Sequence, residues 1–493
     1  MDITFTKRKW YSGMLTSEDW WAVWISIFII FIALLGIFKL DLLGWVAAPK
    51  KWVLSGDNSL AHALAPVSGK YKALGFAGSL AMTYAVLTLI FMVAAKSMKY
   101  ELKKFFIAWT LLFFIVYLAW LAGQHAFLAA DPTNKAKYDL EKVLSLGSGA
   151  SYIMALLIGL IIGNFIKPVA EILRPAAKPE LYIKIAIVFI GVEVGMHAFT
   201  ASGFIFNLAI AGAAATIVAY LIFWPGTYLI ARRVFKMPRK TSAVMASGIS
   251  VCGVSAAVAT AGAVRAKPLI PVMVSALIVI YAVIELVIIP PVFTRALINQ
   301  PVVAGAAMGM AIKTDGADAA AGAMMDEMMR GRKLQRDGVK WAPGFITTSA
   351  IMTKLWIDMF IGIWAFILAF FWMNKIDKKP GEKIPGSEIW HRFPKFVLGY
   401  LFAWFTFLGL LWAAPSLKAS VEASSGPLQK GFRLLFFMMT FVSIGVITDF
   451  RKLAEAKFGK MVFVYLVVLA VFIIPIALLV SWIFHHGMTV PLA

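Results

Sequence analysis

The chain is poor in cysteine and in acidic side chains. Among 493 residues, Cys252 is the single cysteine, which excludes an intrachain disulfide and argues against a cysteine-based metal site. Asp and Glu together number 25 against 47 Lys and Arg, which gives a formal net charge of +22. A nucleic-acid footprint needs a basic face on a soluble domain, and no polar segment is long enough to form one, so we expect no nucleic-acid partner.

Hydrophobic residues are abundant instead. They make up 61% of the chain, and the mean hydropathy is +0.83. Apolar runs of about 18 or more residues between charged loops are typical of a polytopic helical membrane protein. The first run, 20–38, is longer than the ~7 to 15 residues of a signal-peptide core, which indicates a retained span.

The apolar runs predict an all-α, polytopic membrane helical bundle of about 13 spans. Dense basic loops at 96–104, 232–240, 375–395 and 451–460 place the N-terminus in the cytoplasm of a bacterium under the positive-inside rule, with the spans in the inner membrane. The basic segment 326–341 is then an external loop. The predicted spans are 20–40, 72–95, 105–129, 148–166, 184–198, 205–231, 241–264, 268–293, 301–325, 347–374, 396–414, 433–449 and 461–484.

Two regions differ in composition. Residues 1–147 hold three aromatic-rich spans, and we call them the N-terminal module. From residue 148 to 493, small-residue segments and intramembrane ionisable residues recur, as in a transport core.

A stretch of small residues stands out in this core. In Thr241–Ala263, 17 of 23 residues are Gly, Ala, Ser, Thr or Cys, which indicates close approach of another backbone or of a polar solute. A second such stretch covers 301–325, and its DGADAA (315–320) shares a spacing with CGVSAA (252–257). Paired, glycine-interrupted segments in two halves of a chain point to a binding site at the membrane midplane.

Ionisable residues inside predicted spans need a partner or a use, since each costs about 2.5–3.5 kcal/mol to insert. Lys354 and Asp358 lie four residues apart, so they form an ion pair along one helix, or Lys354 faces the core and attracts an anion. Glu285 precedes Pro290 and is expected to reach the membrane interface.

Two further groups contain carboxylates. Glu193 shares a helix face with His197, which suits a structural hydrogen bond or a proton relay. Asp315 and Asp318 repel an anion when ionised, which favours proton or cation coupling, unless Lys313 neutralises them.

Several segments together resemble the YeiH-type sulfate exporter family, which is grouped with cation/proton antiporters and anion transporters. Residues about 151–484 carry the resemblance, and ISVCGVSA (249–256) is its most specific element. The other matching segments are SYIMALLIGLIIGN (151–164), KIAIVFIGVEVG (184–195), VAGAAMGMAIKTDGADAAAG (303–322), AIMTKL (350–355), FPKFVLGYLFA (393–403) and SIGVITDFRKL (443–453).

The resemblance implies about ten core helices with inverted repeats and broken crossing helices, leaving the N-terminal module as an addition. This chain departs from the family pattern in two places. Ile357 replaces a usual basic residue and is followed by Asp358, and AIKTDGADA adds Asp318. Both departures make these segments more acidic than the family pattern.

The function expected is a secondary transporter that moves a small anion, either sulfate or a related sulfur oxyanion or organic anion, by alternating access. The alternative is a cation/proton or sodium-coupled carrier that uses the intramembrane carboxylates. We expect ion coupling by Asp315, Asp318 and Glu193. Substrate binding is expected at Gly248, Ser250, Cys252, Gly253, Ser255, Lys313, Thr314, Gly316 and Lys354.

No enzymatic activity is expected, because the chain lacks a phosphate-binding loop, a zinc-type His cluster and a nucleophile elbow. The sequence therefore predicts no cofactor and no metal. The expected partners are the small anion, a coupling proton or sodium ion, the lipid bilayer and a second copy of the chain in a homodimer.

Overall fold

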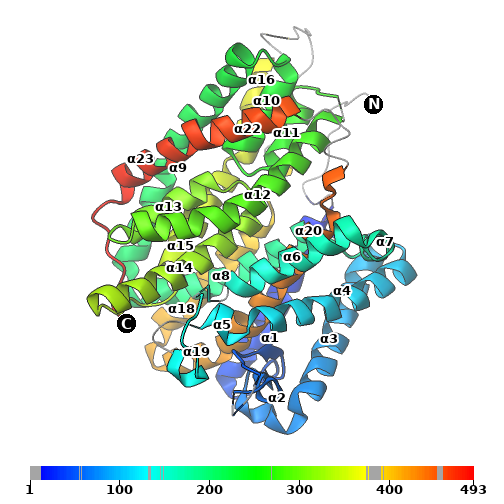
Figure 1. Cartoon of the computed structure of the whole chain (residues 1–493), viewed down its shortest axis with the longest axis vertical. Coiled ribbons are helices and arrows are strands. Elements are labelled where there is room, and N and C mark those ends of the chain that lie inside the picture. Colours follow the sequence, from blue (N-terminus) through cyan, green and yellow to red (C-terminus); the bar gives the residue numbers. More distant parts are fainter. Residues whose placement is uncertain are drawn as a thin grey trace.

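The computed structural model describes residues 11–493 with gaps at 12, 55, 57, 131–134, 145, 148, 268, 373–375, 377–389, 392 and 452–458. Its helices pack side by side in one bundle (Figure 1). Ten helices of the described part are long and apolar enough to cross a membrane, or 11 if α6 (Gly149–Phe165) and α7 (Lys167–Leu173) form one span bent by 115°. The prediction of an all-α polytopic membrane bundle is confirmed.

The predicted count of 13 spans is not confirmed. Two predicted spans, 241–264 and 301–325, are each a pair of helices joined by a break: α10 (Arg239–Ser250) with α11 (Val254–Ala263), and α13 (Pro301–Ala311) with α14 (Asp315–Asp337). The end predicted at residue 325 is also wrong, because α14 continues through the charged segment, which is rich in helix-forming residues, to Asp337. The predicted loops 375–395 and 451–460 lie mostly outside the described residues.

The N-terminal module begins with α1 (Glu18–Leu35), where the Ser17 hydroxyl accepts a hydrogen bond from the Trp20 N–H at 3.3 Å and caps the helix. A two-stranded antiparallel hairpin of β1 (Ala47–Pro49) and β2 (Leu64–Pro66) follows. The module packs α1 on α8 and α18, and α4 on α6. Its other helices are α2 (Leu60–Ala63), α3 (Gly75–Ser97), α4 (Leu102–Gly123) and α5 (Ala126–Ala129).

The remaining helices form the core. They are α6 (Gly149–Phe165), α7 (Lys167–Leu173), α8 (Pro179–Thr200), α9 (Ser202–Leu229), α12 (Leu269–Ala296), α15 (Phe345–Met359), α16 (Ile361–Phe371), α18 (Phe396–Ala413), α19 (Lys418–Pro427), α20 (Arg433–Ile447), α22 (Gly459–Val467) and α23 (Ile474–His485). The short 3₁₀ or π segments are η1 (Gly36–Phe38), η2 (Gly69–Leu74), η3 (Lys135–Tyr138), η4 (Ile230–Val234), η6 (Pro415–Leu417), η7 (Leu428–Phe432) and η8 (Val468–Ile473).

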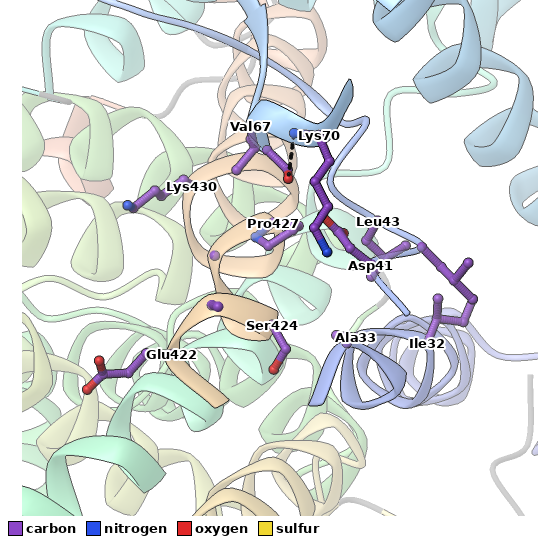
Figure 2. Close-up of a pocket in the computed structure, with 15 residues that line it drawn as sticks. Ile32, Ala33, Asp41, Leu43, Val67, Lys70, Glu422, Ser424, Pro427 and Lys430 are labelled. Carbon is purple, nitrogen blue, oxygen red and sulfur yellow. Dashed lines mark hydrogen bonds between the residues drawn. The ribbon is translucent and has the colours of Figure 1, made fainter. Parts of the chain in front are cut away.

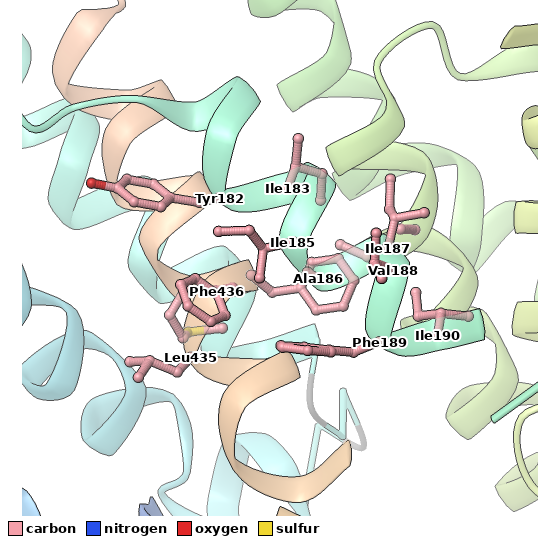
Figure 3. Packing of buried hydrophobic residues seen from close by; sticks show 14 of the residues in the cluster. Tyr182, Ile183, Ile185, Ala186, Ile187, Val188, Phe189, Ile190, Leu435 and Phe436 are labelled. Atoms are coloured by element: carbon pink, nitrogen blue, oxygen red, sulfur yellow. The ribbon is translucent and has the colours of Figure 1, made fainter. Parts of the chain in front are cut away.

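Helix α8 is the centre of the packing. In its most apolar window 78% of residues are buried, whereas the window of the last span is only 33% buried. The ring of Phe189 in α8 lies 6.1 Å from the ring of Phe436 in α20 and is tilted by 46° against it (Figure 3). A Cβ added at Gly191 would lie 2.5 Å from the Tyr400 carbonyl oxygen, so glycine is what allows α18 to lie against α8. Most side chains of α8 therefore face the protein interior.

Candidate functional site at the helix crossing

The two helix breaks touch each other. Three residues separate α10 from α11, and three separate α13 from α14. Gly253 in the first break has φ +70°, and a Cβ there would lie 2.8 Å from the Lys313 carbonyl oxygen in the second. Both the left-handed backbone and the close approach require glycine. The small-residue stretch at 241–263 is thus explained by a crossing of two broken helices.

Lys354 of α15 holds the crossing together. Its ammonium donates to the carbonyl oxygens of Val251 at 3.1 Å, Lys313 at 3.2 Å and Ile312 at 3.4 Å. These carbonyls follow the C-terminal ends of α10 and α13, where helices lack internal acceptor partners and carry partial negative charge. Lys354 is 3% exposed and also interacts electrostatically with Asp358. Its pairing with Asp358 and its position in the core are therefore compatible, and attraction of an anion by Lys354 stays a prediction.

A side chain caps the N-terminal end of α14, one of the paired half-helices. The Thr314 hydroxyl accepts from the Ala317 N–H at 3.3 Å at the start of α14. Cys252 is buried in the break before α11, whose N-terminal end has no side-chain cap among the described residues. Asp315 and Asp318 lie in the first turn of α14, where carboxylates complement the helix dipole. The break that the sequence presents as an anion site is therefore acidic on its α14 side.

Three carboxylates surround a small cavity beside the crossing, which we call the carboxylate cavity. Its volume is about 10 Å³, the space of a single water molecule. Helices α8, α14, α15 and α18 form its wall. The lining residues are Ile187, Asp315, Asp318, Ala319, Ile351, Lys354, Leu355, Asp358 and Phe396.

The polar groups of this cavity are incompletely paired. Asp315 Oδ1 lies 3.9 Å from Lys354 Nζ. Asp358 interacts electrostatically with Asp315 and with Lys354, and its Oδ1 has no hydrogen-bond partner among the described residues. Asp318 is 1% exposed, and within the described residues neither of its carboxylate oxygens has a hydrogen-bond partner. Burial of unpartnered carboxylates is costly, so the cavity favours a bound proton or small cation.

Two more buried ionisable residues, Glu285 and Lys313, lie on another side of the crossing. Glu285 of α12 is 3% exposed and accepts a hydrogen bond from the Tyr465 hydroxyl at 2.8 Å. The fully buried Lys313 donates to the Met310 carbonyl, and its ammonium lies 5.4 Å from the centre of the Phe223 ring. The prediction that Glu285 reaches the membrane interface is wrong, because α12 continues past the two prolines to residue 296.

The other predicted binding residues have packing partners. A Cβ at Gly248 would lie 2.6 Å from an α12 side chain, and one at Gly316 would lie 3.3 Å from an α20 side chain. Ser250 donates to the Thr227 hydroxyl of α9 at 3.3 Å. Ser255 is half-buried in the first turn of α11. These residues surround the crossing rather than the carboxylate cavity.

Glu193 is not brought into the cavity. It pairs with Arg433 and lies beside Gly344, where an added Cβ would come 2.4 Å from its Oε1. Because Gly344 precedes α15 and Lys354 lies ten residues further along, the two sites are about 15 Å apart along that helix. His197 stacks on Phe345 at 4.2 Å in the same region. Sequence reasoning missed Arg433, since nothing local marks it as a partner of a carboxylate in α8.

A larger cavity lies away from the crossing. It has a volume of about 290 Å³ and lies between the end of α1, the 41–70 segment and α19 (Figure 2). Asp41, Lys70, Glu422 and Lys430 are the charged residues around it. None of the predicted site residues lines this cavity. The buried carboxylates of α14 and α15 line the smaller cavity instead.

Comparisons with known proteins agree with the membrane fold. Residues 111–465 match the protein-family model described as Conserved hypothetical protein 698. A UPF0324 membrane protein of Nitrosomonas europaea is 47% identical over 98% of this chain and 98% of its own length. A UPF0324 membrane protein of Nitratidesulfovibrio vulgaris is 32% identical, over 80% of this chain and 62% of its own length.

A solved structure of a sodium proton antiporter from Methanocaldococcus jannaschii aligns with 74% of this chain and 100% of its own. The sequence identity is 13% and the TM-score is 0.18, so this likeness supports no inference. The family match covers both helix breaks and all residues of the carboxylate cavity.

Proposed function

Because the chain belongs to the family described as Conserved hypothetical protein 698, the YeiH-type family that its motifs resemble, we propose that this multi-pass membrane protein is a secondary transporter coupled to a proton or small cation. The observation that carries the proposal is Asp318, a buried carboxylate without a hydrogen-bond partner in the described structure, beside two crossed helix breaks. Broken helices at mid-bundle are the usual ion sites of such carriers.

The charges around the carboxylate cavity support proton or cation coupling. Lys354, which donates to three backbone carbonyls, carries a single positive charge and cannot neutralise the three carboxylates that line the cavity with it. A proton, or a sodium ion held by carboxylate oxygens, would supply the missing charge. Emptying the site would then favour movement of the helices around it, which couples ion binding to a change of access.

The transported solute has two candidates. The first is a cation exchanged for protons, and the second is a small anion. Two buried ammonium groups, Lys313 and Lys354, lie at the crossing, and an anion near them would be attracted when the cavity carboxylates are protonated. Sulfate and related sulfur oxyanions remain within this proposal. We also propose that the protein lies in a bacterial inner membrane as a homodimer, with its N-terminus in the cytoplasm.

Reconstituted protein tests these alternatives. Proteoliposomes carrying a pH-sensitive dye would be given a sodium gradient, a sulfate gradient or neither, and radiolabelled sulfate uptake would be measured in parallel. Proton movement driven by sodium supports cation exchange, and proton movement linked to sulfate uptake supports anion transport. Absence of proton and cation movement under every gradient would refute coupling at the carboxylate cavity.

A further inference from the structure

An ion-pair network covers one end of the carboxylate cavity, and the N-terminal module supplies part of it. Asp19, in the first turn of α1, places Oδ1 3.2 Å from the ammonium of Lys184 in α8. Its Oδ2 accepts the backbone N–H of Lys395 at 2.5 Å, where α18 begins. Lys184 also lies 3.6 Å from Glu180. One carboxylate of the module therefore fixes the starts of two core helices.

The ion-pair network is adjacent to two residues that line the cavity. Lys184 precedes Ile187 by three residues and shares its helix face, and Lys395 immediately precedes Phe396. Ile187 and Phe396 both line the cavity. The Lys184 ammonium is 6.0 Å from the centre of the Phe396 ring, and it interacts electrostatically with Asp315 inside the cavity.

The exposed fraction of the charged side chains rises from the cavity to the protein surface. Asp318 is 1% exposed, and the side chains of Asp315, Lys184, Asp19 and Glu180 are 11%, 12%, 25% and 39% exposed in that order. A series of charged side chains, with Lys184 between two pairs of carboxylates, thus runs from the surface to the deepest carboxylate. A proton or cation that enters the cavity along this series of side chains would pass the Lys184 ammonium.

We infer that the Asp19–Lys184 pair is the gate between the carboxylate cavity and the aqueous phase at this end of the bundle, which rests on the proposed function. Asp19 is a positioning residue: it holds the ammonium over Ile187 and Phe396. When the pair breaks, Lys184 is free to move away from the cavity entrance. The N-terminal module thereby takes part in access to the site, although it contributes no residue to the cavity itself.

Cysteine labelling tests the gate without requiring transport. In a Cys252→Ala background, which has no other cysteine, Ile187→Cys places a thiol in the cavity wall. Its reaction with a water-soluble cationic methanethiosulfonate would be followed by mass spectrometry on protein in detergent. Adding Asp19→Asn should raise the labelling rate about fivefold, the factor expected for loss of a partly exposed ion pair.

A neighbouring residue provides the control. Glu18 pairs with Lys178 at 3.3 Å and accepts from Tyr100 at 2.6 Å at the same end of α1, but these residues do not line the cavity. Glu18→Gln should leave the labelling rate unchanged. An unchanged rate in Asp19→Asn, or an equal increase in Glu18→Gln, overturns the gate.

A second variant covers the case in which Asp19→Asn does not fold. Asp19→Glu keeps the charge and should label within about twofold of the parent, and a fast rate in this variant contradicts the positioning role. The labelling assay tests the gate, and the flux assay tests the proposed function, so the two proposals can be refuted independently. Faster labelling of Asp19→Asn without any proton flux in the parent would retain the gate and refute the proposed function, and the reverse result would retain the function alone.

Discussion

Replacement of Lys354 by methionine tests the crossing most severely. Methionine keeps the length of the apolar stem but removes the ammonium, so the change leaves little empty space. Three backbone carbonyls, those of Val251, Ile312 and Lys313, lose their donor. The ends of α10 and α13 then face each other with partial negative charge uncompensated.

The expected loss of stability follows from these contacts. Each buried carbonyl left without a partner costs about 1–3 kcal/mol, and three would cost about 3–9 kcal/mol. Removal of the ammonium also ends its own desolvation, which offsets part of that sum. The net destabilisation should be about 3–5 kcal/mol, as for other broken buried ionic contacts.

Thermal unfolding in detergent, followed by the fluorescence of the 17 tryptophans, would measure the effect. The matched control is Lys104→Met, because Lys104 pairs with Glu101 at 2.8 Å while both side chains are more than half exposed, at 67% and 64%. The control should unfold close to the parent temperature. If Lys354→Met were as stable as the control, the role of Lys354 in the crossing would be refuted.

Three further substitutions probe separate contacts. Gly253→Ala should destabilise more than Gly338→Ala, since both glycines have positive φ but only the first has atoms crowding its Cβ, and equal thermal shifts would contradict the close approach. Tyr465→Phe should cost about 1–3 kcal/mol in the same thermal assay, because the buried Glu285 loses its donor; an unchanged midpoint would count against that bond. Arg433→Leu should cost about 3–5 kcal/mol by leaving Glu193 unpaired. A double-mutant cycle with Glu193→Gln should show coupling, and simple additivity would rule the pair out.

The sequence predicts the membrane bundle and the place of the crossing, but not the number of spans. Long apolar runs mark membrane helices because the bilayer fixes their length. The segment around Gly253 is identifiable because a close backbone contact leaves a local record, a run of small side chains. The motif resemblance covers the same segments, and the family match confirms it.

Partners distant in sequence could not be predicted in this way. Lys354 meets a carbonyl of Val251 103 residues earlier, and Tyr465 meets Glu285 across 180 residues. No local pattern encodes such contacts, because each depends on how whole helices are arranged. Two prolines after Glu285 suggested a helix end, but buried helices continue through proline when neighbouring groups compensate the lost hydrogen bonds.

Proton flux through reconstituted Asp318→Asn protein is the most direct test of the carboxylate cavity. The comparison is Asp337→Asn, since Asp337 lies at the end of α14 and pairs with Lys333 at 2.6 Å away from the cavity. We predict that Asp337→Asn retains the coupled proton flux of the parent and that Asp318→Asn, inserted and folded equally well, loses it. Parental flux in Asp318→Asn would contradict the assignment of the cavity as the coupling site.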